Sequence, residues 1–216
     1  MRAAVYFDGY NLYHAVNDLG EPFLKWVNLW KLAEEMAKGH SRIIEKVVFC
    51  TAYFPGDTGK RARHEKYVNA LKINGVTVLL GHTTKEPMDC KNCQHKWDAP
   101  REKETDINLA LAIFDDAYQD VFDDAYIVTA DTDQAATMKV LKSRFPNKRI
   151  FSVTPPGRPV AVHLRDLADH KVTITKNHLE ACVMPRVLSR DGFAAVVRPD
   201  EYAPPGWWVH PKDRPR

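Results

Sequence analysis

The sequence predicts an α/β fold in which helices cover both faces of a parallel sheet. Short apolar segments alternate with longer segments whose apolar residues recur at helical spacing. Several of the apolar segments end directly at an aspartate or a glycine, as strands do where the chain turns. Repeated alternation of this kind is typical of parallel sheets whose strands are buried on both faces.

The first half of the chain contains six such segments. In chain order they are a strand at 3–7, a helix at 10–19, a helix at 29–38, a β-rich segment at 46–53, a helix at 60–74 and a strand at 76–80. Asn28 is expected to cap the second helix, because its side chain can accept a hydrogen bond from a free N–H group of the first turn. Gly75 is expected to end the third, because glycine adopts the left-handed conformation that closes many helices.

The second half resumes after a long polar stretch. The expected elements are a helix at 105–118, a strand at 125–129, a helix at 133–145, a strand at 149–153, a short helix at 164–168 and a short strand at 172–175. Residues 82–103 are expected to form a polar loop insertion, which is unusual in a compact domain unless it is functional or held by a metal. The domain is expected to span residues 1–184, and the Pro- and Arg-rich residues 185–216 to form an extended tail.

Composition argues against a membrane-spanning class of protein. Hydrophobic residues make up 44% and charged residues 27% of the 216 positions, as in ordinary globular domains. No run approaches the roughly 18 apolar residues of a membrane span. The N-terminus reaches Asp8 without the apolar core of a secretory signal, so a cytoplasmic location is expected. The sequence leaves the oligomeric state open.

The net charge of +3 does not by itself require a polyanionic partner. The charges are unevenly spread, however. Basic residues gather at 60–72 and in the last 31 residues, whereas acidic residues gather at 102–133. This distribution predicts a basic rim beside an acidic centre.

Three separate elements are predicted to bring carboxylates to one edge of the sheet. Asp8 ends the first strand, Asp131 ends a later strand, and Asp106 lies in the first turn of a helix; Asp133 follows at another helix start. Ligands of such sheets bind at the carboxyl ends of the strands. Grouped carboxylates must hold protons or cations, and oxygen ligands suit Mg²⁺ or Mn²⁺. Each aspartate alone fits a turn or a helix cap, but their common position favours a metal site.

Three segments, in this order, resemble the motifs of the NYN domain family, relatives of the PIN-domain nucleases that include LabA-like proteins. They are V-Y-F-D-G-Y-N-L at 5–12, K-E-T-D-I-N-L-A at 103–110 and I-V-T-A-D-T-D-Q at 127–134. The resemblance covers about residues 1–175. Two positions depart from the third motif: Ala130 stands where glycine is usual, and Gln134 where an aromatic residue is usual. The second departure changes the packing or substrate contact expected at the rim of the site.

The resemblance implies a PIN-like fold and a metal-dependent ribonuclease that hydrolyses RNA phosphodiester bonds. Asp8, Asp106 and Asp131 would be the ligands of a Mg²⁺ or Mn²⁺ ion. Asp133 would hold a second ion or orient water, and Asn11 would hold a ligand or a phosphate by hydrogen bonds. These five residues form the expected catalytic set.

Cys90 and Cys93 form a C-x-x-C pair inside the polar loop. Such a pair is half of a structural zinc site, which needs four ligands. His95 is a third candidate ligand and His82 a fourth, which predicts a zinc ion that holds the loop. The alternative is a pair of free loop thiols in a reducing compartment.

Basic and aromatic residues near the same edge are candidates for contact with RNA. Arg61 and Arg63 follow Tyr53, where a strand end meets a loop. Such groups hold phosphates and stack on unpaired bases, although a solvated helix face is the alternative. Lys103, three residues before Asp106, is the better candidate for contact with the scissile phosphate.

Two other functions remain open at this point. A non-catalytic RNA-binding or regulatory module would keep the nuclease fold without turnover. A phosphatase of the haloacid-dehalogenase type also begins with a strand-end aspartate, but it expects Asp-x-Asp. Here Asp8 is followed by Gly9 and Tyr10, which counts against that class.

Overall fold

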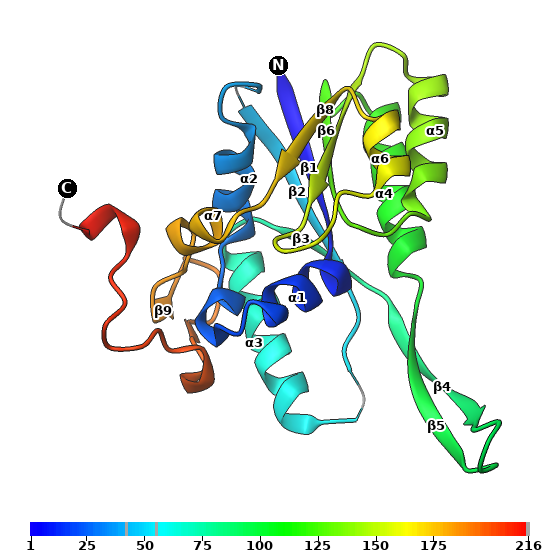
Figure 1. Cartoon of the computed structure of the whole chain (residues 1–216). Helices are drawn as coiled ribbons and strands as arrows, with labels where there is room; N and C mark the ends of the chain where they lie inside the picture. Colours follow the sequence, from blue (N-terminus) through cyan, green and yellow to red (C-terminus); the bar gives the residue numbers. More distant parts are fainter. Residues whose placement is uncertain (42, 55, 215–216) are drawn as a thin grey trace.

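The computed structural model describes residues 1–41, 43–54 and 56–214. Its centre is a six-stranded parallel sheet in the order β3-β2-β1-β6-β7-β8, shown in Figure 1. The strands of this sheet are β1 (Arg2–Asp8), β2 (Ile43–Thr51), β3 (Thr77–Leu80), β6 (Asp124–Val128), β7 (Arg149–Thr154) and β8 (His170–Thr173). The helices are α1 (Gly9–Asp18), α2 (Leu29–Ala37), α3 (Thr58–Ile73), α4 (Thr105–Tyr118), α5 (Gln134–Arg144), α6 (Val162–Leu167) and α7 (Lys176–Ala181). The predicted α/β fold is confirmed.

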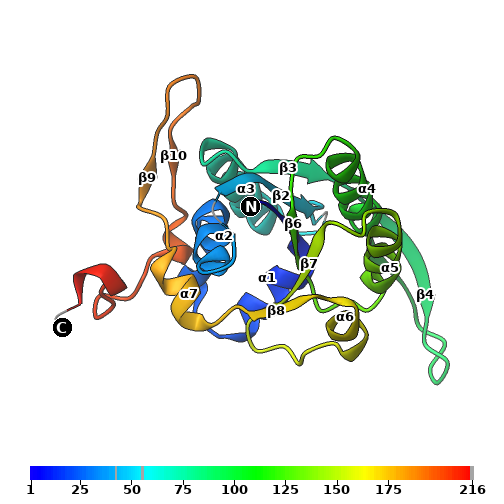
Figure 2. The same cartoon turned by 90° about the horizontal axis from the view of Figure 1, so that it is seen from above.

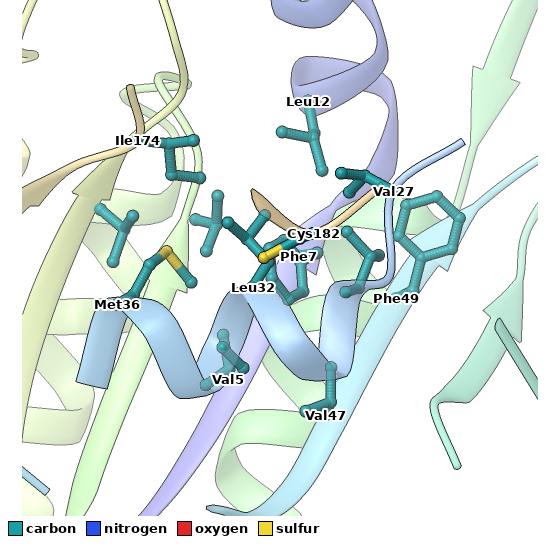
Figure 3. Close-up of a cluster of buried hydrophobic side chains, with 14 of the residues drawn as sticks. Val5, Phe7, Leu12, Val27, Leu32, Met36, Val47, Phe49, Ile174 and Cys182 are labelled. Atoms are coloured by element: carbon teal, nitrogen blue, oxygen red, sulfur yellow. The ribbon is translucent and has the colours of Figure 1, made fainter. Parts of the chain in front are cut away.

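Each face of the sheet carries its own apolar layer, because successive residues of a strand point to opposite sides. Val5 and Phe7 of β1 pack with residues of α1, α2 and α7 in the cluster drawn in Figure 3. Ala4 and Tyr6 pack with residues of α4, α5 and α6. Figure 2 shows the two sets of helices on opposite sides of the sheet. The central strands are therefore buried on both faces, which explains their continuous apolar sequences.

The strand order reverses between β1 and β6. The chain first builds β1, β2 and β3 toward one edge, and then builds β6, β7 and β8 toward the other. β1 and β6 pair in parallel with Phe7 opposite Val128, so Asp8 lies level with the residue that follows β6. In sheets of this order, a crevice opens outside the carboxyl ends of the two strands at the reversal. Asp8 and the segment after Val128 stand at that crevice.

The helix ends follow the local signals in the sequence. Asn28 caps α2, because its Oδ1 accepts a hydrogen bond from the N–H of Lys31 at 3.1 Å. Gly75 follows α3 with a φ of +85°, a conformation that costs glycine little. No helix within the three described ranges has the length and apolar character needed to cross a membrane.

The prediction of a polar loop at 82–103 is wrong. These residues form a separate two-stranded antiparallel hairpin, β4 (His82–Asp89) and β5 (Lys96–Lys103), which extends away from the body in Figure 1. Polar and charged residues occupy both faces, so no apolar alternation marked the strands in the sequence. Cross-strand pairing holds the hairpin, with His82 opposite Lys103 at its base and Asp89 opposite Lys96 near its tip. We call this hairpin the arm.

The residues after Pro185 do not form a free extended tail in their described part. They contain a short hairpin, β9 (Val187–Leu188) with β10 (Val196–Val197), and two 3₁₀ turns, η2 (Asp200–Tyr202) and η3 (Pro211–Asp213). Val196 packs with Trp26 in a small buried cluster, and the Trp26 indole N–H donates to the carbonyl of Pro185 at 3.0 Å. Trp208 packs against Phe23 with ring centroids 5.2 Å apart. The segment therefore covers aromatic side chains of the domain, which its own weak periodicity did not reveal.

One buried ionic contact ties the sheet to α4. Asp116, which is only 1% exposed, accepts from the Nζ of Lys46 on β2 at 2.5 Å. Its second oxygen accepts from the hydroxyl of Tyr6 on β1 at 2.9 Å. Both carboxylate oxygens are thus satisfied, as a buried charge requires.

Candidate functional site

Asp8 forms the floor of the site at the end of β1. It is 6% exposed, and its Oδ1 accepts from the backbone N–H of Asn11 at 3.0 Å, which caps α1. Its Oδ2 accepts from the hydroxyl of Thr129 at 2.8 Å. Gly9 lets α1 begin directly against β2, because a Cβ at this position would lie 2.5 Å from the carbonyl oxygen of Cys50. The glycine after Asp8 is therefore needed for the close approach of α1 to β2 and not for a turn.

The segment after β6 is fixed to the same point by polar contacts. The side-chain oxygen of Asn11 accepts from the N–H of Ala130 at 3.1 Å, and the Thr129 hydroxyl accepts from the N–H of Asp131 at 3.0 Å. Asp131 in turn accepts from the N–H of Asp133 at 2.9 Å. The side chains of Asn11 and Thr129 thus hold the loop after β6 at the edge of the sheet. The Asp131 carboxylate remains partly exposed there. Asn11 thus positions this loop through a hydrogen bond to its backbone.

Asp106 lies in the first turn of α4 and is exposed. The side chain of Gln134 donates to its backbone oxygen at 3.4 Å, and Thr137 donates to Gln134 at 2.9 Å. Gln134 is buried, although its position usually carries an aromatic residue in the family motif. Here it joins the starts of α4 and α5 by hydrogen bonds. Gln134, where the motif usually has an aromatic residue, therefore helps to hold the helix start that carries Asp106 next to the helix start that follows Asp133.

Electrostatics link the three carboxylates. Burial raises the pKa of Asp8 to about 6 against the lowering effect of its two hydrogen bonds, and the charges of Asp106 and Asp131 raise it further. The pKa of Asp106 is also raised, first by burial and then by Asp131 and Glu102. The charges of Asp106 and Asp131 thus oppose the ionisation of Asp8, and the charge of Asp131 opposes that of Asp106. That Asp8, Asp106 and Asp131 together form a metal site stays a prediction.

Glu102 belongs to this environment and was missed by sequence reasoning. It is the second-last residue of β5, and its Oε1 accepts from the backbone N–H of Thr105 at 3.0 Å as well as from the Thr105 hydroxyl. It therefore supplies the cap that the N-cap residue of α4, Glu104, does not supply with its own side chain. Glu102 reaches this position because the arm is a hairpin, which the sequence did not predict. The local sequence offered one sign of the capping role: Glu102 lies three residues before Thr105, the first residue of α4.

The three carboxylates match a divalent cation in their chemistry but are not arranged as a closed set of ligands. Hard carboxylate oxygens with uncompensated negative charge fit Mg²⁺ or Mn²⁺, which accept one or two protein carboxylates and complete their shells with water. Among residues 1–41, 43–54 and 56–214, however, no three Asp, Glu, His or Cys side chains are grouped closely enough to hold a metal together. The chemistry of the set fits the ion, whereas a closed cage of protein ligands is absent from the described residues.

A pocket of about 540 Å³ opens beside the acidic site, between α1, α3 and the 3₁₀ turn η1 (Pro22–Lys25). Gly9 and Tyr10 of α1 line it, and they directly follow Asp8 in the chain, so the pocket adjoins the acidic site. Burial and the charge of Glu102 raise the pKa of Tyr10. The aromatic rings that line the pocket are those of Tyr10, Tyr13, Phe49, Phe54, Tyr67 and Tyr202.

Three cations also line this pocket: Lys25, Lys60 and Arg63. The pKa of Lys25 is lowered by burial and by the charges of Arg63 and Lys60, so the three face a common space. Burial lowers the pKa of the wall residue His64 to about 4, so it is neutral at pH 7. The pocket therefore combines aromatic walls with positive charge, partly offset by Glu201, which accepts from Arg63 at 2.9 Å.

The predicted substrate-binding residues divide between the pocket and other positions. Arg63 lines the pocket, and its predicted contact with RNA stays a prediction. Arg61 packs over the Tyr53 ring at 5.4 Å and pairs with Glu65 on its own helix, so both lie outside the pocket wall. Lys103 is turned along the arm, where its Nζ pairs with Glu86 at 2.5 Å. The cross-strand pairing of the arm makes this contact and directs Lys103 away from Asp106.

The predicted four zinc ligands do not come together. His82 lies at the base of the arm, roughly 25 Å of strand from Cys90 near the tip, and pairs with Glu104 at 3.1 Å. His95 is stacked on Trp97, with ring centroids 6.0 Å apart. Cys90 and Cys93 are free thiols, and the N–H groups of Cys93 and Asn92 lower the pKa of Cys90. The turn therefore presents two sulfur ligands, and the length of the strand explains why His82 cannot be the fourth ligand that was predicted.

A doubly wound parallel sheet with carboxylates at its switch point is the architecture of a nuclease-like, PIN-like domain. The chain belongs to the NYN domain family, whose sequence model matches residues 2–175. The resemblance drawn from the three motifs is thereby confirmed.

Two individual proteins are also similar to this chain. The 6-hydroxy-3-succinoylpyridine 3-monooxygenase HspA of Pseudomonas putida (strain DSM 28022 / S16) is 26% identical over 242 residues, which cover 94% of this chain and 75% of that protein. A crystal structure of a protein of unknown function from Vibrio parahaemolyticus RIMD 2210633 superposes with a TM-score of 0.51 at 19% identity. It covers 81% of this chain and 93% of that one. The second similarity supports the fold alone.

Proposed function

We propose that this protein is a metal-dependent ribonuclease that hydrolyses RNA phosphodiester bonds at the crevice between β1 and β6. The observation that carries the proposal is the acidic set Asp8, Asp106 and Asp131, in which each carboxylate comes from a different part of the fold and the charges of Asp106 and Asp131 act on the buried Asp8. Nothing basic neutralises Asp8 among its hydrogen-bond partners. Membership of a nuclease-like family supports the same reading.

The roles of the residues follow from their contacts. Asp8, Asp106 and Asp131 would hold one or two Mg²⁺ or Mn²⁺ ions, and Asp133 would contribute at the rim. When bound, a divalent cation supplies charge stabilisation and lowers the pKa of coordinated water. Asn11 and Thr129 hold the loop after β6 in place through backbone hydrogen bonds, and so position Asp131 relative to Asp8.

The pocket beside the acidic site suits an unpaired nucleotide of an RNA substrate. Aromatic rings stack with bases irrespective of their identity, and cations attract the phosphate backbone. Tyr10 stands at the boundary between the pocket and the acidic site, and Arg63 and Lys60 lie on the pocket wall. A strand that crosses the site would place a phosphate near the carboxylates and a neighbouring base in the pocket.

Cleavage of a labelled single-stranded RNA by the full chain, with Mn²⁺ and with EDTA, tests the proposal. Hydrolysis breaks the P–O3′ bond as water adds to phosphorus, which leaves a 5′-phosphate and a 3′-hydroxyl. Asp131→Asn should abolish cleavage, whereas Asp191→Asn, an exposed change in the β9–β10 hairpin, should not. Cyclic phosphate ends, or equal cleavage in EDTA, would contradict a metal mechanism. RNA binding without cleavage by the wild type would favour the non-catalytic module.

A second candidate is action on a small aromatic acid. The specific observation is the same pocket, whose volume of about 540 Å³ suits a drug-sized ligand and whose aromatic walls and cations suit a planar ring with a carboxylate. The Pseudomonas putida protein is named for a hydroxypyridine that carries a succinoyl chain. Its similarity brings this ligand class into consideration for the present chain.

Calorimetric titration of the protein with pyridine and benzene carboxylates separates the two candidates. Saturable binding that is lost in Lys25→Gln/Arg63→Gln, together with no cleavage of RNA, would favour the aromatic acid. Cleavage of RNA with no binding of these acids would favour the nuclease. Asp131→Asn serves as the matched variant, because it lies outside the pocket wall and should leave binding of an aromatic acid unchanged.

A further inference from the structure

The tip of the arm is a tight, ordered turn that carries the two sulfur ligands. The N–H of Cys90 donates to the carbonyl of His95 at 2.9 Å, and the N–H of Gln94 donates back to the carbonyl of Cys90 at 2.8 Å. Gln94 has a φ of +57°, so the chain turns left-handed directly after Cys93. This turn brings the two cysteines back on the same short loop, with the N–H groups of Asn92 and Cys93 facing the Cys90 sulfur.

The tip provides half of a metal site and no more. Structural zinc sites are tetrahedral, and a C-x-x-C turn supplies two of the four ligands. No third Asp, Glu, His or Cys side chain is grouped with the two thiols in the part of the chain that the structure describes. His95, the nearest candidate in sequence, stacks its ring on Trp97 at an interplanar angle of 15°. A four-ligand zinc site at the tip would therefore need two ligands from another molecule.

A second copy of this chain would supply two further sulfur ligands from its own Cys90 and Cys93. The arm extends away from the body of the molecule in both Figure 1 and Figure 2, so two tips can meet without contact between the two bodies. Cys93 is exposed and Cys90 is partly exposed, so neither sulfur is enclosed by the body of its own molecule. Two tips related by a twofold axis would offer four thiolates, which is a complete structural zinc set.

Charge and surface at the tip are compatible with this contact. Four thiolates around one Zn²⁺ leave a net negative charge, and at each tip Lys91 and Lys96 outweigh Asp89 to offset it. Met88 and Trp97 pair across the two strands just below the turn, and Trp97 is 44% exposed. These side chains line a shallow hollow beside the tip that a second arm can cover.

We infer that two copies of the chain join at the tips of their arms around one zinc ion, with Cys90 and Cys93 from each copy as ligands. This site is separate from the acidic site and does not depend on the proposed nuclease activity. It would hold two acidic sites in one assembly, one on each body.

The experiment measures molar mass and metal content of the full chain under a reductant that does not bind zinc. Metal-free protein is titrated with Zn²⁺ during light scattering coupled to gel filtration, and bound zinc is then counted. We expect the molar mass to double as zinc saturates at one ion per two chains, and to return on addition of EDTA. Co²⁺ in place of zinc should show the thiolate charge-transfer absorption of a four-sulfur site.

Two variants identify the ligands. Cys90→Ser/Cys93→Ser should lose both zinc and the doubling of mass, while the buried Cys50 and Cys182 remain as internal controls. His95→Ala should keep both. One zinc per chain with unchanged mass, loss of zinc in His95→Ala, or no zinc bound by reduced wild type would each overturn the inference. Circular dichroism of the variants verifies that the exposed substitutions leave the fold intact.

Discussion

The environment of Asp8 differs strongly from that of a surface carboxylate. Its two oxygens each accept one hydrogen bond, yet burial and two neighbouring aspartates keep the pKa near 6. In the unfolded chain the pKa returns to about 3.9. The folded state therefore binds more protons than the unfolded state between about pH 4 and pH 6, and ionised Asp8 destabilises the metal-free fold above that range.

This difference predicts a pH-dependent effect of Asp8→Asn. The unfolding free energy of the variant, relative to wild type, should rise by up to about 3 kcal/mol between pH 4 and pH 7 without metal, since about two pKa units are involved. Urea melts at intervals of half a pH unit measure it. Taking the difference between the two proteins cancels the opposite effect of acids such as Asp120, whose pKa is lowered to about 2 by Lys148 and Arg2. A difference that stays flat across this range would show that Asp8 ionises normally.

Asp106→Asn separates the metal-binding role from the capping role of a helix-start residue. Asparagine keeps the shape of the side chain and removes one charge that acts on Asp8 and faces Asp131 and Glu102. The metal-free variant should be as stable as wild type or slightly more stable. Wild type at a Mn²⁺ concentration 100 times its dissociation constant should gain about 2.7 kcal/mol. The variant should gain much less, and its cleavage of RNA should fall by about 100-fold or more.

Paired thermal melts and cleavage assays, each with and without Mn²⁺, measure both effects. Asp191→Asn is the control for loss of an aspartate charge outside the site. Normal cleavage by Asp106→Asn, or a wild type that does not respond to Mn²⁺ in either assay, would assign Asp106 to the helix start alone.

At the scale of elements, the chain beyond Pro185 shows how a segment with weak local periodicity becomes part of the fold. Its contacts with the domain are scattered. Val196 packs beside Trp26, Arg190 donates to the carbonyl of Ile73 at 3.1 Å, and Arg214 pairs with Glu180. The six-stranded sheet is complete at Thr173, before any of these contacts begins. The segment therefore stabilises a domain that already has its sheet.

Truncation after Pro185 should leave a folded domain with a lower melting temperature. The loss exposes Trp26 and Phe23, which are 0% and 2% exposed in the full chain. A cost of about 3 kcal/mol from lost apolar burial corresponds to a decrease of roughly 6 to 12 °C for a domain of this size. Differential scanning fluorimetry of the truncated and full chains measures it. An unfolded product would place the boundary of the domain beyond Pro185, and an unchanged melting temperature would show that the packing contributes nothing.

At the scale of the whole molecule, the acidic site and the basic, aromatic pocket lie side by side. The start of α1 separates them. Asp8, the N-cap residue of α1, and Asn11 belong to the acidic site, whereas Tyr13 and Asn17 line the pocket. For an RNA substrate this arrangement predicts that charge in the pocket affects binding, while the carboxylates affect turnover. The two contributions can therefore be measured apart.

Lys25→Gln/Arg63→Gln should raise KM for RNA by roughly 10-fold or more and leave kcat within about twofold, because each lost phosphate contact is worth about 1 kcal/mol. The dependence of affinity on salt should also become weaker, since fewer counterions are released. Lys139→Gln, an exposed change on α5 across the sheet, is the matched control. A large fall in kcat with unchanged KM would place these cations in the chemical step instead.

Several features could be predicted from the sequence because they depend on neighbours along the chain. Strand and helix periods, the cap at Asn28, the turn at Gly75 and the helix from Thr105 to Tyr118 are local properties, and the structure has all of them. The strand end at Asp8 and the helix start at Asp106 are likewise local features, whereas the common metal site that the rule for parallel sheets predicts for Asp8, Asp106 and Asp131 stays a prediction.

Other features were decided only by the tertiary structure, because they depend on residues far apart in the chain. The strands of the arm are polar on both faces, so their pairing leaves no periodic signal, yet it brings Glu102 to the acidic site and turns Lys103 toward Glu86. Asp116 could be taken for a surface residue of α4 until Lys46 and Tyr6 are seen to enclose it. Burial, charge pairing and the walls of the pocket depend on which residues lie close together in space, and the periods of helices and strands do not encode this.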